Sequence, residues 1–427
     1  MEASLSAQED HVISQLDYTL PKLASYATER IEAVYTPAGA VFRPDGLRLM
    51  RIPITSDGFV DASSIVIEAT LRNHSTTKLL SISDPSLACL IAEMRVFMSG
   101  VEVERVQDYG RLTETLNRGI SMEKRINSAD LELGISRSAT GVAEGIGFGN
   151  DSGFIHPGTV AMAGSTTMFH KPLLGICQQK AFVPTWALTS QGLVLEILLC
   201  SGMADPLLTG ADGALAPLAS EDWSIEQVRL HCDVLKINSQ MQNSYASHIL
   251  SGKSLTLPMR SYTTVRFTNS AEQTLLQIPR TFSRLNSVMV TFYRKAGGPA
   301  SSSATNYLWA PPDTISTTIQ CGSVKYPQNR YQGLKEAYWR YLKGLGLVHS
   351  SAHAANVTFH EFTKASFQAH YDLERVANAP HSGANTHEGV LSIDIRGLGP
   401  NPPELIYVHL FHDLLCEISD GQVVVAL

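Results

Sequence analysis

The chain has 427 residues, with 33 Lys and Arg against 40 Asp and Glu and a net charge of −7. Its charged residues amount to 17% of the sequence, below the roughly 25% that is usual in soluble domains. The length favours about two or three domains, and the acidic balance argues against a chain that wraps nucleic acid, because that needs a dense Lys/Arg face. With so little charge, much of the surface is expected to lie against partners.

Six cysteines are scattered along the chain, and no two have the CxxC or CxC spacing of a metal or redox motif. Several lie in apolar runs, as Cys200 does after LVLEILL, so we expect buried, reduced thiols. The N-terminal sequence MEASLSAQED is polar and acidic, unlike a signal peptide, and no apolar run reaches the length that spans a bilayer. The sequence therefore predicts a protein made and folded in a cytoplasm.

Residues 1–40 have a helical pattern. Ser6 and Glu9 have the spacing of a capping box, which begins a helix. An apolar stripe at helical spacing follows and ends at Pro37. We expect a helical arm that needs another surface to lie against. The stripe consists of Ile13, Leu16, Leu20, Leu23, Tyr26, Ala27, Ile31 and Val34.

After Pro44 the apolar period changes to two, which is typical of strands. Ser99 and Gly100 form the turn of a predicted hairpin, and a short helix is expected after it. The second half of the chain repeats this scheme and adds a helical stripe over residues 334–345. Many short strands separated by turn signals predict β-sandwiches. Clear strand patterns occur at 65–72, 94–103, 192–199, 228–237, 254–257, 263–267, 288–293, 390–395, 405–410 and 422–427.

Residues 131–170 are rich in glycine and serine, which predicts a long surface loop or set of loops. Such a stretch buries little apolar surface and loses much entropy when it is ordered. We therefore expect it to become ordered by packing against a neighbouring subunit. The predicted anchors are Phe148 and Phe154, with Ile155 and Met162 beside them.

Three short patterns recur in the same order in the two halves of the chain. The clearest is V-x-L-x-x-D-[VL]-L, which begins at Val228 and again 180 residues later at Val408. Changed loop lengths explain why the other two matches have other offsets. Two copies of one fold are therefore predicted. The matching segments are 228–235 with 408–415, 90–97 with 285–292, and 192–197 with 389–394.

Four stretches carry a resemblance to a known family, the double jelly-roll major capsid proteins of tailless icosahedral DNA viruses. That lineage includes adenoviruses, virophages, polinton-like viruses and large algal viruses. The resemblance covers about residues 40–427 and rests on diffuse apolar patterns, not on catalytic signatures. The stretches are SLACLIAEMRVFMSGVEVERVQDYGRL (86–112), KPLLGICQQKAFVPTWALTSQGLVLEILL (171–199), WSIEQVRLHCDVLKI (223–237) and ELIYVHLFHDLLCEISDGQVVVAL (404–427).

The resemblance implies an all-β chain of two tandem eight-stranded jelly-roll β-sandwiches, with long loop insertions, a few short helices and the N-terminal helical arm. The expected domains are the arm at 1–40, a first roll at 41–240 and a second roll at 241–427. In such a family three chains form a pseudo-hexagonal homotrimer that tiles the shell of a virion made in the host cell cytoplasm. Expected partners are neighbouring capsomers, minor capsid or penton proteins, and an inner membrane or inner layer under the arm, but no sequence-specific nucleic acid.

Motifs for chemistry are absent or weak. The sequence has no GxSxG, HExxH or GxxxxGK[ST] motif, and its GxGxG run at 145–149 lacks a flanking βαβ pattern. His409 and His412 differ in strand parity, which favours surface or interface histidines over a metal site. Asp233 and Asp413 correspond under the repeat and lie in separate rolls, which favours turn or cap roles over acid–base catalysis. We predict no enzyme activity, no catalytic residue, no metal and no cofactor.

Two other functions compete with a shell protein. A tandem jelly-roll enzyme, bicupin-like or glycan-acting, or a carbohydrate-binding protein would need a clustered polar site, which the sequence does not assemble. A viral spike or receptor-binding protein would need fibrous repeats or a distinct head, and neither is visible in the sequence.

Overall fold

The structure of the protein is a computed structural model. The arm residues Ile13, Leu16, Leu20 and Leu23, the loop residues Phe148 and Phe154, and the GxGxG run lie outside the described ranges. The roles expected for them therefore stay predictions. The described residues are 26–82, 86–119, 159–188, 192–203, 205–207, 220–293, 309, 311–345, 357–364, 367–375, 382–387, 389–419 and 421–426.

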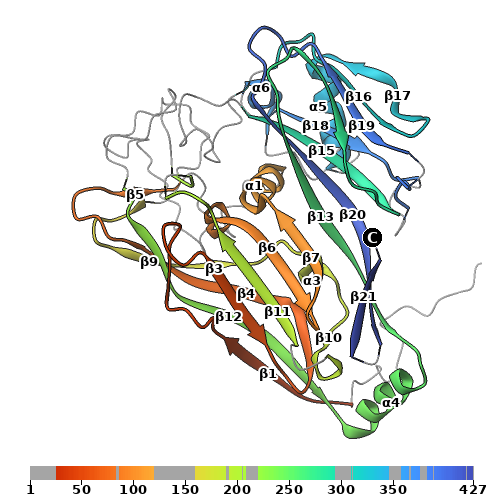
Figure 1. The fold of residues 1–427 in the computed structure, drawn as a ribbon. Coiled ribbons are helices and arrows are strands. Elements are labelled where there is room, and N and C mark those ends of the chain that lie inside the picture. The colour runs from red at the N-terminus through yellow and green to blue at the C-terminus, as the bar shows by residue number, and fades with distance from the viewer. Residues whose placement is uncertain are drawn as a thin grey trace, which may run out of the picture.

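The first half of the chain folds as a β-sandwich of two antiparallel sheets (Figure 1). One sheet has the strand order β1-β12-β4-β10, with β2 paired to β12 and β9 paired to β4, and the other has the order β3-β11-β6-β7. Buried and exposed residues alternate along β3, because a strand points successive side chains to opposite faces. The strands are β1 (Ala27–Tyr35), β2 (Val41–Phe42), β3 (Leu49–Ile54), β4 (Phe59–Asn73), β6 (Ile91–Met98), β7 (Val101–Gln107), β9 (Ser165–His170), β10 (Val183–Pro184), β11 (Leu193–Leu199) and β12 (Trp223–Ile237).

The second half folds as another sandwich, with the orders β13-β20-β15-β18 and β14-β19-β16-β17 and with β21 paired to β20. A small separate pair joins β5 (Leu80–Ser81) to β8 (Thr159–Val160). The strands of the second sandwich are β13 (Leu255–Thr268), β14 (Gln273–Ile278), β15 (Leu285–Tyr293), β16 (Ser316–Cys321), β17 (Val324–Gln332), β18 (Gln368–Asp372), β19 (Leu391–Arg396), β20 (Leu405–Ser419) and β21 (Gln422–Ala426).

The two sandwiches have the same topology. In each, one sheet takes the first, eighth, third and sixth principal strands, and the other takes the second, seventh, fourth and fifth. In the first sandwich β9 and β10 share the sixth place, since both pair with β4. This is the arrangement of a jelly roll. The fold class predicted from the sequence, two tandem eight-stranded jelly rolls, is confirmed.

Two of the three internal sequence matches fall on equivalent strands. The match at Val228 and Val408 lies in β12 and β20, the eighth strands, and both valines are buried. The match at 192–197 and 389–394 lies in β11 and β19, the seventh strands, but its alignment is one residue off. Leu193 pairs with Ile54 at the end of β3, just as Leu391 pairs with the last residue of β14. Such a slip of one residue exchanges the two faces of a strand.

The third match, between 90–97 and 285–292, is wrong. β6 is the fourth strand of its roll, whereas β15 is the third strand of the other. Both strands are largely buried. Buried strands share an apolar composition whatever their place in a sheet, and that composition produced the match.

Residues 27–35 form the edge strand β1, so the prediction that the helical stripe continues through Ala27, Ile31 and Val34 is wrong. β1 pairs along its length with β12, while Ala33 and Tyr35 pack against the core of the first roll. Apolar residues three or four apart indicate a helix only where no sheet edge competes. Here an open edge supplies backbone partners and a buried face, and this tertiary gain overrides local propensity.

Short helices connect the strands. The link between the rolls is α4, which begins after Asn238, whose side chain accepts a hydrogen bond of 2.9 Å from the Met241 amide. In the first roll α1 follows the fifth strand, and in the second roll α5 does the same. The helices are η2 (Leu87–Leu90), α1 (Tyr109–Gly119), α3 (Gly175–Gln178), η3 (Thr185–Ala187), α4 (Ser239–Leu250), α5 (Gly333–Gly344) and α6 (Phe359–Lys364).

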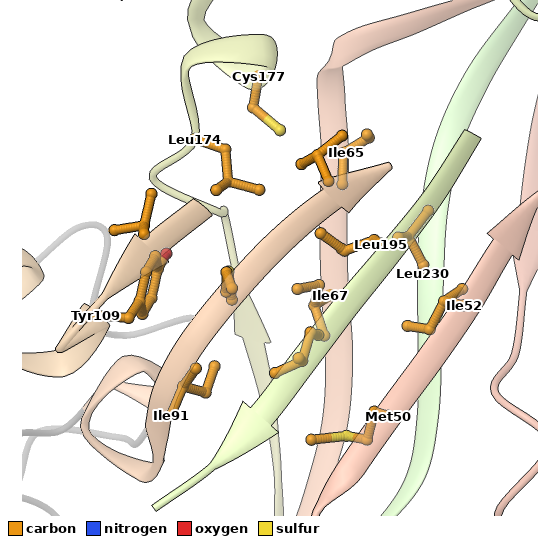
Figure 2. Close-up of a cluster of buried hydrophobic side chains, with 14 of the residues drawn as sticks. Met50, Ile52, Ile65, Ile67, Ile91, Tyr109, Leu174, Cys177, Leu195 and Leu230 are labelled. Carbon is orange, nitrogen blue, oxygen red and sulfur yellow. The ribbon is translucent and has the colours of Figure 1, made fainter. Parts of the chain in front are cut away.

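Each roll has its own apolar core, which we call the first core and the second core. Figure 2 shows part of the first core, where Ile52 and Leu195 of one sheet approach Ile67 and Leu230 of the other. The first core also receives the lower ends of β13 and β20, through residues such as Met259, and it receives β21. In Figure 1 these strands descend from the second roll beside β7. The rolls therefore share a packed junction.

Candidate assembly surfaces

A buried carboxylate joins the two rolls. Glu104 of β7 is 2% exposed. It accepts hydrogen bonds from the amides of Gly175 at 2.8 Å and Ile176 at 3.3 Å, and from the Ser261 hydroxyl of β13 at 2.8 Å. Burial raises the pKa of this carboxyl, while the three donors act in the opposite direction. Glu104 thus links α3 of the first roll to β13 of the second.

Helix α1 forms the upper part of the same junction. The Arg111 guanidinium lies 4.4 Å from the centroid of the Tyr293 ring on β15, a cation–π geometry. Arg111 also lies 3.6 Å from a Glu114 carboxylate oxygen within the helix. Both charged side chains are buried, so each needs its partner where water is excluded.

His409 and His412, which sequence reasoning assigned to the surface or to interfaces, are buried inside the chain. His409 lies 3.0 Å from the Thr264 hydroxyl, and burial, with a smaller effect of Arg111, lowers its pKa to about 3. His412 lies 3.1 Å from the Thr263 hydroxyl, and burial lowers its pKa to about 4. Burial also lowers the pKa of His370 to about 4. The parity argument missed this burial because β20 is covered on both faces.

The other histidines of the second roll form no metal-binding group within the described residues. His360 and His387 are exposed, while His349, His353 and His381 lie outside the described residues. Within the described residues no three His, Cys, Asp or Glu side chains are grouped to hold a metal ion. All six cysteines are free thiols, and burial raises the pKa of Cys200 and Cys232 to about 12.

Asp233 and Asp413 occupy equivalent strands, as the repeat predicts, but neither serves a turn or cap. Asp233 lies within β12 and is hydrogen-bonded by Arg30 of β1. Asp413 lies within β20, is buried, and accepts a hydrogen bond of 2.8 Å from the Asn286 amide. The two aspartates pair neighbouring strands in separate rolls, so the turn or cap interpretation is wrong.

The outer face of the sheet formed by β1, β12 and β4 carries a ladder of charges, which we call the β12 surface. Glu32 lies 3.4 Å from His231, and His231 lies 2.8 Å from Glu68. The Glu32 side chain is 70% exposed. Two apolar side chains, Val34 and Phe169, are exposed beside these charges.

A second surface lies on α5, and we call it the α5 surface. Lys335, Trp339 and Lys343 are exposed and four residues apart, so they share one helix face. Trp339 is 47% exposed, which is unusual for so large an apolar side chain. Phe359 of α6 is also exposed. Sequence reasoning noticed the inner stripe of this helix, where Tyr341 is buried, and missed the outer one.

Comparison with known proteins identifies the fold. No family model and no curated protein sequence matches the chain. Solved structures do match it. The chain is similar to VP54 of the virus PBCV-1, fitted into a reconstruction of the virophage Sputnik, with a TM-score of 0.65 and 9% identity over 97% of this chain and 100% of that one. The chain has the fold of viral major capsid proteins.

Two further structures agree. The Faustovirus major capsid protein matches with a TM-score of 0.60 and 7% identity, covering 96% of this chain and 93% of that chain. A chain of the Sputnik virophage matches with a TM-score of 0.59 and 8% identity, covering 98% of this chain and 92% of that chain. The likeness therefore extends over both rolls. Among the described residues, no helix is both long and apolar enough to cross a membrane.

Proposed function

We propose that this chain is a major capsid protein, a structural component of an icosahedral virion and not an enzyme. The observation that carries the proposal is the doubled jelly roll, matched along 97% of the chain by a capsid protein of PBCV-1. Buried polar groups support it, since Glu104 and His409 are buried and lie within hydrogen-bond distance of hydroxyls of β13.

The functional unit that we propose is a homotrimer. Two equivalent rolls in one chain give six rolls in three chains, and six similar rolls around one axis make a block that tiles a shell. Its partners are other copies of itself, neighbouring capsomers and minor capsid or penton proteins. The arm, with Ile13, Leu16, Leu20 and Leu23, is proposed to contact neighbouring capsomers or an inner layer.

Light scattering after gel filtration tests the trimer. We expect a particle of three times the 46.5 kDa of one chain, with a six-lobed outline in negative-stain microscopy. A stable monomer at micromolar concentration would contradict the proposal.

A further inference from the structure

One buried histidine of the described structure differs from the other three. His170, His409 and His412 each lie between 2.8 and 3.1 Å from a hydroxyl of another strand or helix. His370 of β18 is also buried, at 7% exposed, but among the described residues none is hydrogen-bonded to its ring. A neutral imidazole carries one donor and one acceptor, and a buried polar group without a partner is rare. The ring of His370 therefore has hydrogen-bonding capacity to offer.

His370 lines a cavity of about 230 Å³ between β17, β18 and the end of α5, which we call the β17–α5 cavity. These elements are neighbours in the second roll (Figure 1), where β17 is the edge of one sheet and β18 is the edge of the other. A water molecule takes about 30 Å³ in the liquid, and pockets for drug-sized ligands begin at about 300 Å³. The cavity therefore has room for several waters or for one small ring.

Two local features of the sequence shape this cavity. Gly344 lies against the ring of His370, and a Cβ atom at that position would overlap the imidazole, so glycine lets the end of α5 approach β18. On the opposite side, the pairing of β17 with β16 is interrupted between Tyr326 and Tyr331. Pro327 lies in this bulge and lines the cavity beside Tyr326. Bulges at a sheet edge redirect side chains in this way.

The charges that line the cavity are balanced. The Arg340 guanidinium donates a hydrogen bond of 2.8 Å to Glu336, and the Lys343 ammonium lies 3.7 Å from the Asp372 carboxylate. Gly344 lies at the C-terminal end of α5, where the helix dipole disfavours an anion. The cavity thus offers donors and an acceptor side by side, without the excess of positive charge that would select an anion.

We propose that the β17–α5 cavity binds a neutral hexopyranose, either as a free sugar or as the terminal residue of a glycan. A sugar hydroxyl both donates and accepts hydrogen bonds, so it can donate to Asp372 and accept from Lys343, while His370 takes either role. The apolar face of the sugar ring packs on Tyr326 and Pro327. This inference does not rest on the proposed function, because a shell protein can assemble without such a site.

Binding is tested on the full chain, in the oligomeric state in which it elutes from gel filtration. Saturation-transfer NMR with methyl α-glucoside, methyl β-galactoside and methyl α-mannoside should detect at least one of the three, and calorimetry then measures its affinity. An array of immobilised glycans that end in the same sugars distinguishes the two sources of the ligand. Binding in solution and on the array indicates the end of a glycan, whereas binding in solution alone indicates a free sugar.

Variants locate the binding in the cavity. Lys343→Ala and Asp372→Ala should each weaken it by about tenfold or more, because each removes a charged hydrogen-bonding partner. Lys335→Ala is the matched control, since it lies on the same helix outside the cavity, and should bind within about twofold of the wild type. His370→Leu should lose binding, whereas His370→Gln, which keeps a donor and an acceptor, should retain part of it. Circular dichroism and melting temperatures check that each variant is folded.

Three results would overturn the inference. The first is that none of the three glycosides binds, which would leave the cavity to water. The second is that inorganic phosphate binds in their place and depends on Lys343, which would make the cavity an anion site. The third is that a glycoside binds equally well to the wild type, Lys343→Ala and His370→Leu, which would place the sugar elsewhere. None of these results bears on the trimer, which light scattering tests separately.

Discussion

At the scale of single residues, Glu104 is a side chain that links the two rolls directly by hydrogen bonds. Its carboxylate is buried and satisfies two amides of α3 and the hydroxyl of Ser261. A buried donor left without an acceptor costs about 1–3 kcal/mol, so the size of the replacement side chain matters less than its ability to accept hydrogen bonds.

We therefore expect Glu104→Ala to lower the free energy of unfolding by about 3 kcal/mol and Glu104→Gln by about 1 kcal/mol, because the amide oxygen still accepts from two donors. Urea denaturation at neutral pH measures both. Glu102→Ala, an exposed change on the same strand, should stay within about 0.5 kcal/mol of the wild type. Equal losses in the Ala and Gln variants would contradict the assigned role.

The buried histidines predict how stability depends on pH. An unfolded chain protonates its histidines near pH 6.5, whereas folding lowers the pKa of His409 to about 3 and that of His412 to about 4. Between these values the unfolded state binds more protons, so stability is full above about pH 6.5 and falls as the pH drops towards 4.

Between pH 7 and pH 5 each buried histidine should remove on the order of 2 kcal/mol of stability. In His409→Gln this pH-dependent loss should be smaller than in the wild type by about that amount, measured by urea denaturation at the two pH values. His387→Gln, at an exposed position, is the control and should keep the full loss. An unchanged pH dependence in His409→Gln would refute the assignment.

At the scale of elements, β20 contributes buried side chains to both the first core and the second core. Leu410 is buried in the second core, and Leu414, four residues further along the strand on the same face, is buried in the first core. A single strand thus contributes to the stability of both rolls. The same substitution should destabilise the second roll when made at Leu410 and the first roll when made at Leu414.

Leu410→Ala and Leu414→Ala should each lower the free energy of unfolding by about 2–5 kcal/mol. Native-state hydrogen exchange should locate the damage, because rolls can open separately below the global transition. We expect faster exchange in β14 and β19 for Leu410→Ala, and in β6 and β11 for Leu414→Ala. Identical exchange maps for the two variants would show that the cores do not respond separately.

At the scale of the whole molecule, the N-terminal segment contains the strand β1 and, before it in the sequence, the predicted apolar stripe. Residues 27–35 complete a sheet as β1, so a deletion that removes them exposes the edge of β12 and disturbs the fold. The apolar stripe at Ile13, Leu16, Leu20 and Leu23 precedes that strand.

Deleting residues 1–25 should therefore leave trimer mass and melting temperature unchanged but prevent shell assembly, as judged by electron microscopy of assembly reactions. Deleting residues 1–36 should in addition lower the melting temperature, because β12 loses its partner strand. Normal shells from the shorter deletion would disprove a role for the stripe in contacts between capsomers.

The sequence by itself determined the class of fold and its doubling. Period-two apolar patterns and the pattern shared by Val228 and Val408 report local geometry, because a strand that is buried on one face must alternate.

Only the tertiary structure decided what each strand lies against. β1 became a strand because an edge was open to it, and His409 and Glu104 became buried because one roll is seated on the other. Trp339 remained 47% exposed on the outer face of α5, with the Arg340 guanidinium 5.6 Å from its ring centroid. These outcomes depend on contacts between residues far apart in sequence, and a local pattern carries no information about which distant surface will cover it.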